Sequence, residues 1–178
     1  MIKTDSISKV FRTEEVETHA LVDVTLDVKK GEFVAIMGPS GCGKSTLLNI
    51  LGLLDKPTTG GYMLDGTDMT VLSDQERNVY RRGTLGFIFQ SFNLIDELTV
   101  EENIELPLLY MKVPASERKH RIEDALKRMD MVHRSKHFPS QLSGGQQQRT
   151  AIARAIVMQP KLILADEPTG NLDSKNGQ

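Results

Sequence analysis

The chain has 178 residues, 39% of them hydrophobic and 26% charged, so it can bury a core as one ordinary globular domain. Its net charge of −2 gives no basic footprint, which argues against nucleic acid as the main partner. No apolar run reaches the length that spans a bilayer, and the N-terminus lacks the apolar stretch of a signal peptide, so we expect any membrane role to depend on a partner.

The first 30 residues predict antiparallel strands. Residues 22–29 alternate apolar and polar side chains at every step, which is the pattern of a strand with one buried and one wet face. A polar loop that begins at Phe11 precedes this strand. The turn at residues 30–32 then leads into an apolar run.

Residues 38–45 fit the phosphate-binding pattern G-x-x-x-x-G-K-[ST]. In this pattern the glycines let successive backbone N–H groups point into one concavity, Lys44 reaches the β- and γ-phosphates, and the Ser45 hydroxyl can ligate Mg²⁺. The apolar run at residues 33–37 predicts a buried parallel strand, and residues 45–51 predict a helix whose N-terminus faces the phosphates. The alternative is a glycine-rich turn that happens to precede Lys-Ser. The flanking elements favour binding of a nucleoside triphosphate.

The middle of the chain changes from strand patterns to helix patterns. Residues 62–66 predict a short strand with a turn, and residues 84–89 predict a core strand that ends at Gln90. Residues 99–102 fit a capping box ahead of a helix that Pro107 limits or kinks. A second helix is expected from Ser116 to Met131, because apolar and charged residues alternate there at helical spacing.

The last third contains a second glycine-rich helix start and a strand that ends in acids. Ser143 predicts the N-cap of a helix that runs to Pro160, and its glycines make it a second potential phosphate cradle, although a flexible surface turn reads the same way. The apolar run after Lys161 ends in Asp166 and Glu167. Asp166 could hold Mg²⁺ and Glu167 could polarise an attacking water; the alternative is a strand capped by two surface acids, and the phosphate loop favours the first reading.

In this order the motifs resemble those of the ATP-binding-cassette (ABC) ATPases along the whole chain. Residues 38–45 resemble the Walker A motif, residues 142–146 the signature motif, and residues 162–166 the Walker B strand. Gln90 resembles the Q-loop glutamine, Glu167 the catalytic glutamate, residues 171–173 the D-loop, and Phe11 the aromatic residue that stacks on adenine. Residues 32–39, 89–94, 105–108 and 165–173 further resemble the lipoprotein-releasing and macrolide-exporting branch of the family.

The resemblance implies an α/β fold: a phosphate-loop NTPase core with a mixed, mainly parallel sheet and flanking helices, an N-terminal antiparallel β subdomain and an inserted helical subdomain. It implies one domain over residues 1–178, incomplete at its C-terminus. Residues 1–90 form the ATP-binding core with the antiparallel part, 91–142 the helical subdomain, and 143–178 the signature helix, the Walker B strand and the D-loop.

The resemblance also implies the function, which is binding and hydrolysis of ATP with Mg²⁺ to power a transporter, of the export or lipoprotein-release type. Two copies pair head-to-tail, and an integral-membrane permease contacts the helical subdomain, so the chain is cytoplasmic and peripheral on the inner face of the membrane. The alternatives are a soluble ABC ATPase that regulates cell division or translation, and a nucleotide-binding fragment without turnover. The transported substrate is not encoded in this chain.

The implied site comprises three sets of residues. The catalytic residues are Glu167, Lys44 and Gln90, and the magnesium ligands are Ser45, Gln90 and Asp166. The nucleotide-binding residues are Phe11, Gly38, Pro39, Ser40, Gly41, Cys42, Gly43, Lys44, Ser45, Thr46, Ser143, Gly144, Gly145, Gln146 and Asp173.

The chain departs from the family pattern at its end. The family's switch histidine follows the D-loop, whereas the four histidines here, at positions 19, 120, 133 and 137, all precede Asp166. We therefore expect an incomplete cassette that binds ATP weakly and hydrolyses it poorly.

Overall fold

A computed structural model describes residues 1–170, which belong to two compact units. The first unit is Met1–Arg81 and the second begins at Arg82. No helix within residues 1–170 is both long enough and apolar enough to cross a bilayer. The division into segments 1–90, 91–142 and 143–178 stays a prediction.

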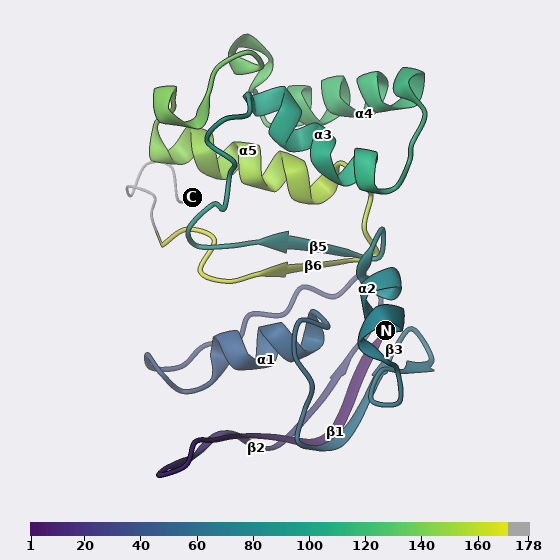
Figure 1. Ribbon diagram of the computed structural model, residues 1–178, viewed down its shortest axis with the longest axis vertical. Coiled ribbons are helices and arrows are strands. Elements are labelled where there is room, and N and C mark those ends of the chain that lie inside the picture. Colours follow the sequence, from purple (N-terminus) through teal and green to yellow (C-terminus); the bar gives the residue numbers. More distant parts are fainter. Residues whose placement is uncertain (171–178) are drawn as a thin grey trace. The chain divides into compact units, whose positions relative to one another are not determined.

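The first unit is built on an antiparallel sheet, as the sequence predicts (Figure 1). Its strand order is β2-β1-β3-β4, and β1 pairs with both β2 and β3. Ile2, Thr4 and Ile7 of β1 are buried, so this central strand supplies much of the core of the sheet. The strands are β1 (Ile2–Arg12), β2 (Glu17–Val28), β3 (Thr59–Leu64) and β4 (Thr67–Asp68).

The helix α1 (Lys44–Leu51), which the sequence also predicts, buries Leu47 and Ile50. It is tied to the sheet by Tyr62 of β3, whose hydroxyl donates to the carbonyl of Leu51 at 2.6 Å. Burial raises the pKa of Tyr62, so its proton stays on the oxygen and available for this bond. The C-terminal end of α1 is therefore hydrogen-bonded to the sheet.

A helix that was not predicted, α2 (Asp74–Arg81), completes the first unit. It begins where Ser73 and Glu76 exchange hydrogen bonds: the Ser73 amide donates to the Glu76 carboxylate at 2.8 Å, and the Glu76 amide donates to the Ser73 hydroxyl at 3.3 Å. This Ser-x-x-Glu pattern is the capping-box signal that would have predicted the helix.

The prediction of a buried strand at residues 33–37 is wrong for the described structure. The segment is in no strand and is exposed throughout, with Phe33 96% and Met37 91% exposed. A strand needs a neighbour for its N–H and C=O groups. No strand within residues 1–170 pairs with this segment. Its apolar composition indicates a preference for burial but cannot supply the partner that burial requires.

The second unit contains a parallel strand pair and a group of helices, and Figure 1 shows α5 between the pair and the other helices. Residues Leu85 to Ile88 pair in register with Leu162 to Ala165. The elements are β5 (Leu85–Ile88), β6 (Leu162–Ala165), α3 (Val100–Tyr110), α4 (Ala115–Arg128), α5 (Gly144–Ile156) and the 3₁₀ turns η1 (Val132–Arg134) and η2 (Pro139–Gln141).

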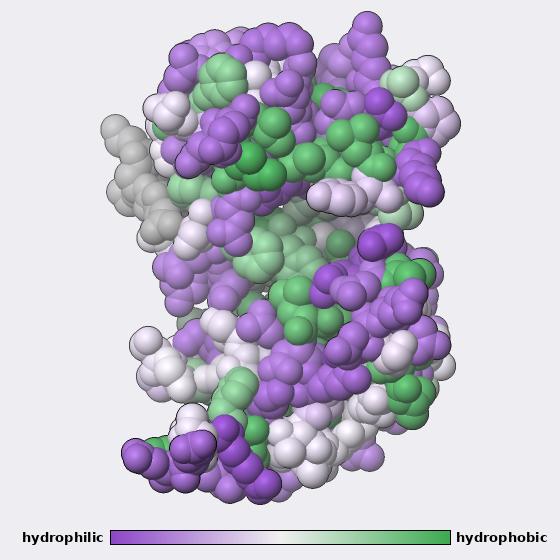
Figure 2. All heavy atoms as spheres, viewed as in Figure 1, coloured by the Kyte–Doolittle hydropathy of each residue, from purple (hydrophilic) through white to green (hydrophobic). Residues whose placement is uncertain are grey.

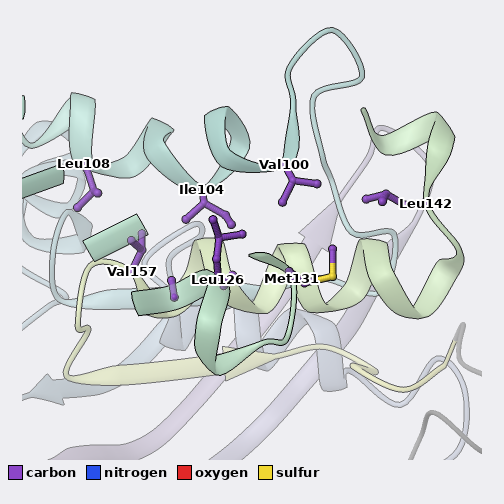
Figure 3. Packing of buried hydrophobic residues seen from close by; sticks show 9 residues of the cluster. Val100, Ile104, Leu108, Leu126, Met131, Leu142 and Val157 are labelled. Carbon is purple, nitrogen blue, oxygen red and sulfur yellow. The ribbon is translucent and has the colours of Figure 1, made fainter. Parts of the chain in front are cut away.

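The core of the second unit is formed where α3, α4 and α5 meet (Figure 3). The capping box predicted at Thr99 and Glu102 is confirmed: the Thr99 amide donates to the Glu102 carboxylate at 2.8 Å. The helix that it starts continues three residues beyond Pro107. The buried cluster consists of Val100, Ile104, Leu108, Ala125, Leu126, Met131, Leu142, Ala153 and Val157.

We expect Ile104→Ala to lower the free energy of unfolding by about 2–5 kcal/mol, because it leaves a cavity among these fully buried side chains. Urea unfolding followed by circular dichroism measures the change. Tyr110→Ala is the matched control on the same helix, since Tyr110 is 73% exposed. Equal losses for the two variants would contradict the assignment of this core.

Candidate functional site

The phosphate-loop residues form a loop in the first unit that leads into α1. Gly41 and Gly43 have φ values of +78° and +92°, in the left-handed region that favours glycine. The Lys44 ammonium donates to the carbonyls of Gly38 and Pro39, at 2.9 and 2.8 Å. The loop therefore curls round its own lysine.

Gly43 is the point where the loop meets the sheet. A Cβ there would lie 2.3 Å from the Ala20 carbonyl oxygen and 2.9 Å from a methyl carbon of Leu21, both on β2. Gly43 is also the N-cap residue of α1, and none of the described side chains caps that helix end or places an acid in its first turn. Such a helix start presents N–H groups and a partial positive charge, which suits an anion.

Phe11 lies in the same unit near the end of β1, opposite Thr18 of β2. Its ring is 44% exposed, and the Lys9 ammonium lies 5.1 Å from the ring centroid. The same ammonium forms an ion pair with Asp55 at 2.7 Å. The Lys9 ammonium therefore lies near the Phe11 ring, and the ring keeps exposed surface on which a planar ligand could stack.

In the second unit, parallel pairing brings together two of the predicted catalytic residues. Ile88 ends β5 and Ala165 ends β6, and the two are register partners. Gln90 and Glu167 each follow two positions later, so they emerge at the same edge of the strand pair. The Gln90 amide donates to the Glu167 carboxylate at 2.9 Å, although 77 residues separate them in the sequence.

The backbone around Glu167 is tightly arranged. The Asp166 amide donates to the Ile88 carbonyl at 2.9 Å and so extends the pairing beyond β6. Glu167 has a φ of +43°, and the Gly170 amide donates back to its carbonyl at 2.9 Å, which closes a turn with Pro168 in second position. A Cβ at Gly170 would lie 3.1 Å from the Gln90 amide nitrogen, so a larger residue would crowd the Gln90–Glu167 pair.

The predicted second cradle is the start of α5, and Ser143 is its N-cap as expected. The Ser143 amide donates to the Gln146 side-chain oxygen at 3.0 Å, and the Gln146 amide donates back to the Ser143 hydroxyl at 3.4 Å. This reciprocal box fixes where the helix begins, with Gly144 and Gly145 as its first two residues. Ser143 itself is exposed.

Sequence reasoning missed Arg154, which lies further along α5. Its guanidinium donates to the carbonyls of Phe92 and Asn93, at 2.7 and 2.5 Å, and burial lowers its pKa. Phe92 and Asn93 both have positive φ, so the segment that follows Gln90 is held by α5 in an unusual conformation. The sequence signal that could have identified Arg154 is its place between two small apolar residues of a helix, Ala153 and Ala155. Both alanines are buried in the structure.

The predicted magnesium ligands are suitable in their chemistry. Ser45, Gln90 and Asp166 carry a hydroxyl, an amide and a carboxylate, and such oxygens are the donors that Mg²⁺ prefers. No cluster of three or more His, Cys, Asp and Glu side chains occurs within residues 1–170. Mg²⁺ bound to phosphates uses only one or two carboxylates, so the donor set fits this ion. The D-loop, with Asp173, lies outside the described residues.

A family model described as ABC transporter matches residues 21–170. The chain belongs to this family. Over all 178 residues of this chain, it is 51% identical to the macrolide export ATP-binding/permease protein MacB of Brucella melitensis. Over the same residues it is 47% identical to the ABC transporter ATP-binding protein YknY of Bacillus subtilis. It spans 28% of MacB and 77% of YknY.

A solved structure confirms the expected fold class. The ATP-binding cassette MJ0796 of Methanocaldococcus jannaschii, described as a dimer in a post-hydrolysis state bound to ADP and phosphate, aligns with a TM-score of 0.92 at 49% identity. The alignment covers 99% of this chain and 78% of that one. The α/β fold of an ABC ATPase is therefore shown for this chain.

We expect Gly43→Ala to destabilise the first unit by at least about 2 kcal/mol, because the new methyl group would overlap the Ala20 carbonyl. Gly41→Ala is the control: its φ is also positive, but nothing described lies within 4 Å of the added carbon, so only about 1 kcal/mol of strain is expected. Thermal unfolding without nucleotide compares the two. A similar shift in both variants would show that the loop does not depend on its contact with β2.

Proposed function

We propose that this chain is the ATP-binding and ATP-hydrolysing part of an ABC transporter of the export type. The observation that carries the proposal is the hydrogen bond between Gln90 and Glu167 at the end of the parallel strand pair, in a chain that also forms a phosphate loop. The names of relatives support the transport class, since MacB is described as a macrolide export ATP-binding/permease protein.

The phosphate loop holds the nucleotide. Lys44 exchanges its bonds to the Gly38 and Pro39 carbonyls for the β- and γ-phosphates, and the first-turn N–H groups of α1 donate to the same phosphate oxygens. The Phe11 ring stacks on adenine. Ser45, Gln90 and Asp166 would hold Mg²⁺, and the bound ion would supply positive charge against the charge that develops on the phosphates.

Glu167 is the general base for hydrolysis. Its carboxylate accepts a proton from the water that attacks the γ-phosphate, and Gln90 keeps this carboxylate oriented through the bond at 2.9 Å. With nucleotide bound, the amide oxygen of Gln90 would be available to Mg²⁺ while its nitrogen donates to Glu167. Gln90 thus links the state of the nucleotide to the segment at Phe92 and Asn93 that Arg154 holds.

A second copy completes the site. The N-terminus of α5, with Ser143, Gly144, Gly145 and Gln146, donates to the γ-phosphate that is bound to the phosphate loop of the other copy. Asp173 of the D-loop contributes at the same interface. The dimeric structure of MJ0796 supports this arrangement. ATP closes the pair and hydrolysis opens it.

The membrane partner is an integral permease that binds the helical part of the second unit. The end of α3 carries three successive exposed apolar residues, Leu109, Tyr110 and Met111. Figure 2 shows that hydrophobic residues reach the surface of this unit between hydrophilic ones. A permease combined with an ATP-binding domain in one protein, as in the name of MacB, supports this occupant. The chain then lies on the cytoplasmic face of the membrane.

We expect Glu167→Gln to lower ATP turnover about 100-fold or more and to leave ATP affinity nearly unchanged, because an amide cannot accept the proton. Lys44→Ala should instead abolish most ATP binding. Calorimetric titration of ATP and a phosphate-release assay measure the two properties.

The controls separate this proposal from its alternatives. ATP binding without turnover in the unaltered chain would favour a nucleotide-binding module over an ATPase. Unchanged turnover in Glu167→Gln would rule out Glu167 as the base. Co-purification with an integral-membrane subunit supports the transporter, and association with ribosomes or the division machinery would favour a regulatory ABC ATPase.

A further inference from the structure

Gln148 is a buried polar residue that neither the sequence motifs nor the proposed mechanism uses. It lies on the inner face of α5 with Ala151 and Ala155, at helical spacings of three and seven, and its side chain is 2% exposed. Its amide nitrogen donates to the carbonyl of Pro168 at 2.7 Å. Its amide oxygen has no hydrogen-bond partner within residues 1–170. A half-satisfied buried amide is costly, so its one bond requires a reason.

The acceptor of that bond points to the reason. Pro168 directly follows Glu167 and stands in the turn that the Gly170 amide closes onto the Glu167 carbonyl. Glu167 itself has a positive φ, a conformation that a non-glycine residue keeps only when its surroundings hold it there. The bond from Gln148 joins a packed helix to this turn across 20 residues of sequence.

We propose that Gln148 is a positioning residue for Glu167. By holding the Pro168 carbonyl, it fixes the peptide plane between Pro168 and Thr169, inside the turn that starts at Glu167, and so the direction in which the carboxylate meets Gln90. The helix that carries Gln148 begins only a few residues earlier with Ser143 and Gln146. Displacement of the start of α5 is therefore passed to the base through one side chain. This role rests on the proposed function of Glu167 in hydrolysis.

The competing explanation is a polar core residue that only adds stability. The two explanations predict different effects for Gln148→Met, which keeps the length of the side chain and removes its donor. A stabilising residue would lower the stability of the whole unit. A positioning residue would loosen residues 166–170 and leave global stability nearly unchanged, because the unpartnered amide oxygen is removed together with the bond.

Hydrogen–deuterium exchange of the full chain measures this directly and needs no ATP turnover. In Gln148→Met we expect the amides of Asp166 and Gly170 to exchange about ten-fold faster, as loss of one anchoring hydrogen bond predicts, and those of α3 to be unchanged. Gln147→Met is the matched control, since within residues 1–170 the Gln147 side chain donates only to the nearby Leu142 carbonyl, at 3.3 Å. Unchanged exchange at residues 166–170, or the same acceleration in the control, would overturn the proposal.

Gln148→Glu adds a readout that a purely structural role would not give. An ionised carboxylate cannot donate to the Pro168 carbonyl, whereas a protonated one can, and burial raises the pKa of the introduced carboxyl. The ratio of exchange rates between this variant and the unaltered chain at residues 166–170 should therefore fall towards one as the pH is lowered through that pKa. A ratio that does not change with pH would count against the hydrogen bond as the anchor.

Turnover gives the functional half of the test. We expect Gln148→Met to lower kcat about ten-fold and to change KM less than two-fold, because the phosphate loop is untouched. Loosened exchange with unchanged kcat would reject the positioning role while leaving the ATPase proposal intact. Failure of the ATPase proposal is recognised separately, by turnover that does not depend on Glu167.

Discussion

The parallel pairing of β5 with β6 is the constraint on which the proposed chemistry depends. The register that places Ile88 beside Ala165 leaves Gln90 and Glu167 at one edge, each two residues past its strand, and one amide–carboxylate bond then joins them. In a parallel pair both chains leave in the same direction, so polar residues at the two carboxyl ends are forced to meet. A slip of one residue would turn either side chain to the other face.

Helix α5 holds this arrangement from one side. Its N-terminus is fixed by the Ser143–Gln146 box, Gln148 bonds to the turn after Glu167, and Arg154 bonds to the carbonyls of Phe92 and Asn93 beyond Gln90. The same helix packs against α3 and α4 in the core that contains Val157. One helix therefore contacts both the segment after Gln90 and the turn after Glu167.

In the first unit, the corresponding constraint is the shape of the phosphate loop, residues 38–45, whose backbone N–H groups suit an anion. Gly43 allows the loop to lie against the Ala20 carbonyl, where no other residue fits, and Tyr62 ties the end of α1 to β3. The Lys44 ammonium meanwhile donates hydrogen bonds to the carbonyls of Gly38 and Pro39 in the loop. These bonds fold the loop in advance, and in the proposed function a phosphate replaces contacts that are already shaped for it.

What the sequence by itself determined was local: the strands of the antiparallel sheet, the phosphate loop, and the helix starts at Thr99 and Ser143. Each depends on alternation, glycine or capping chemistry within a few residues. Only the tertiary structure decided that residues 33–37 lie exposed, that Gln90 contacts Glu167, and that Gln148 and Arg154 hold the segments around them. These features depend on which distant segment supplies a hydrogen-bond partner, and apolar runs and motif spacing do not contain that information.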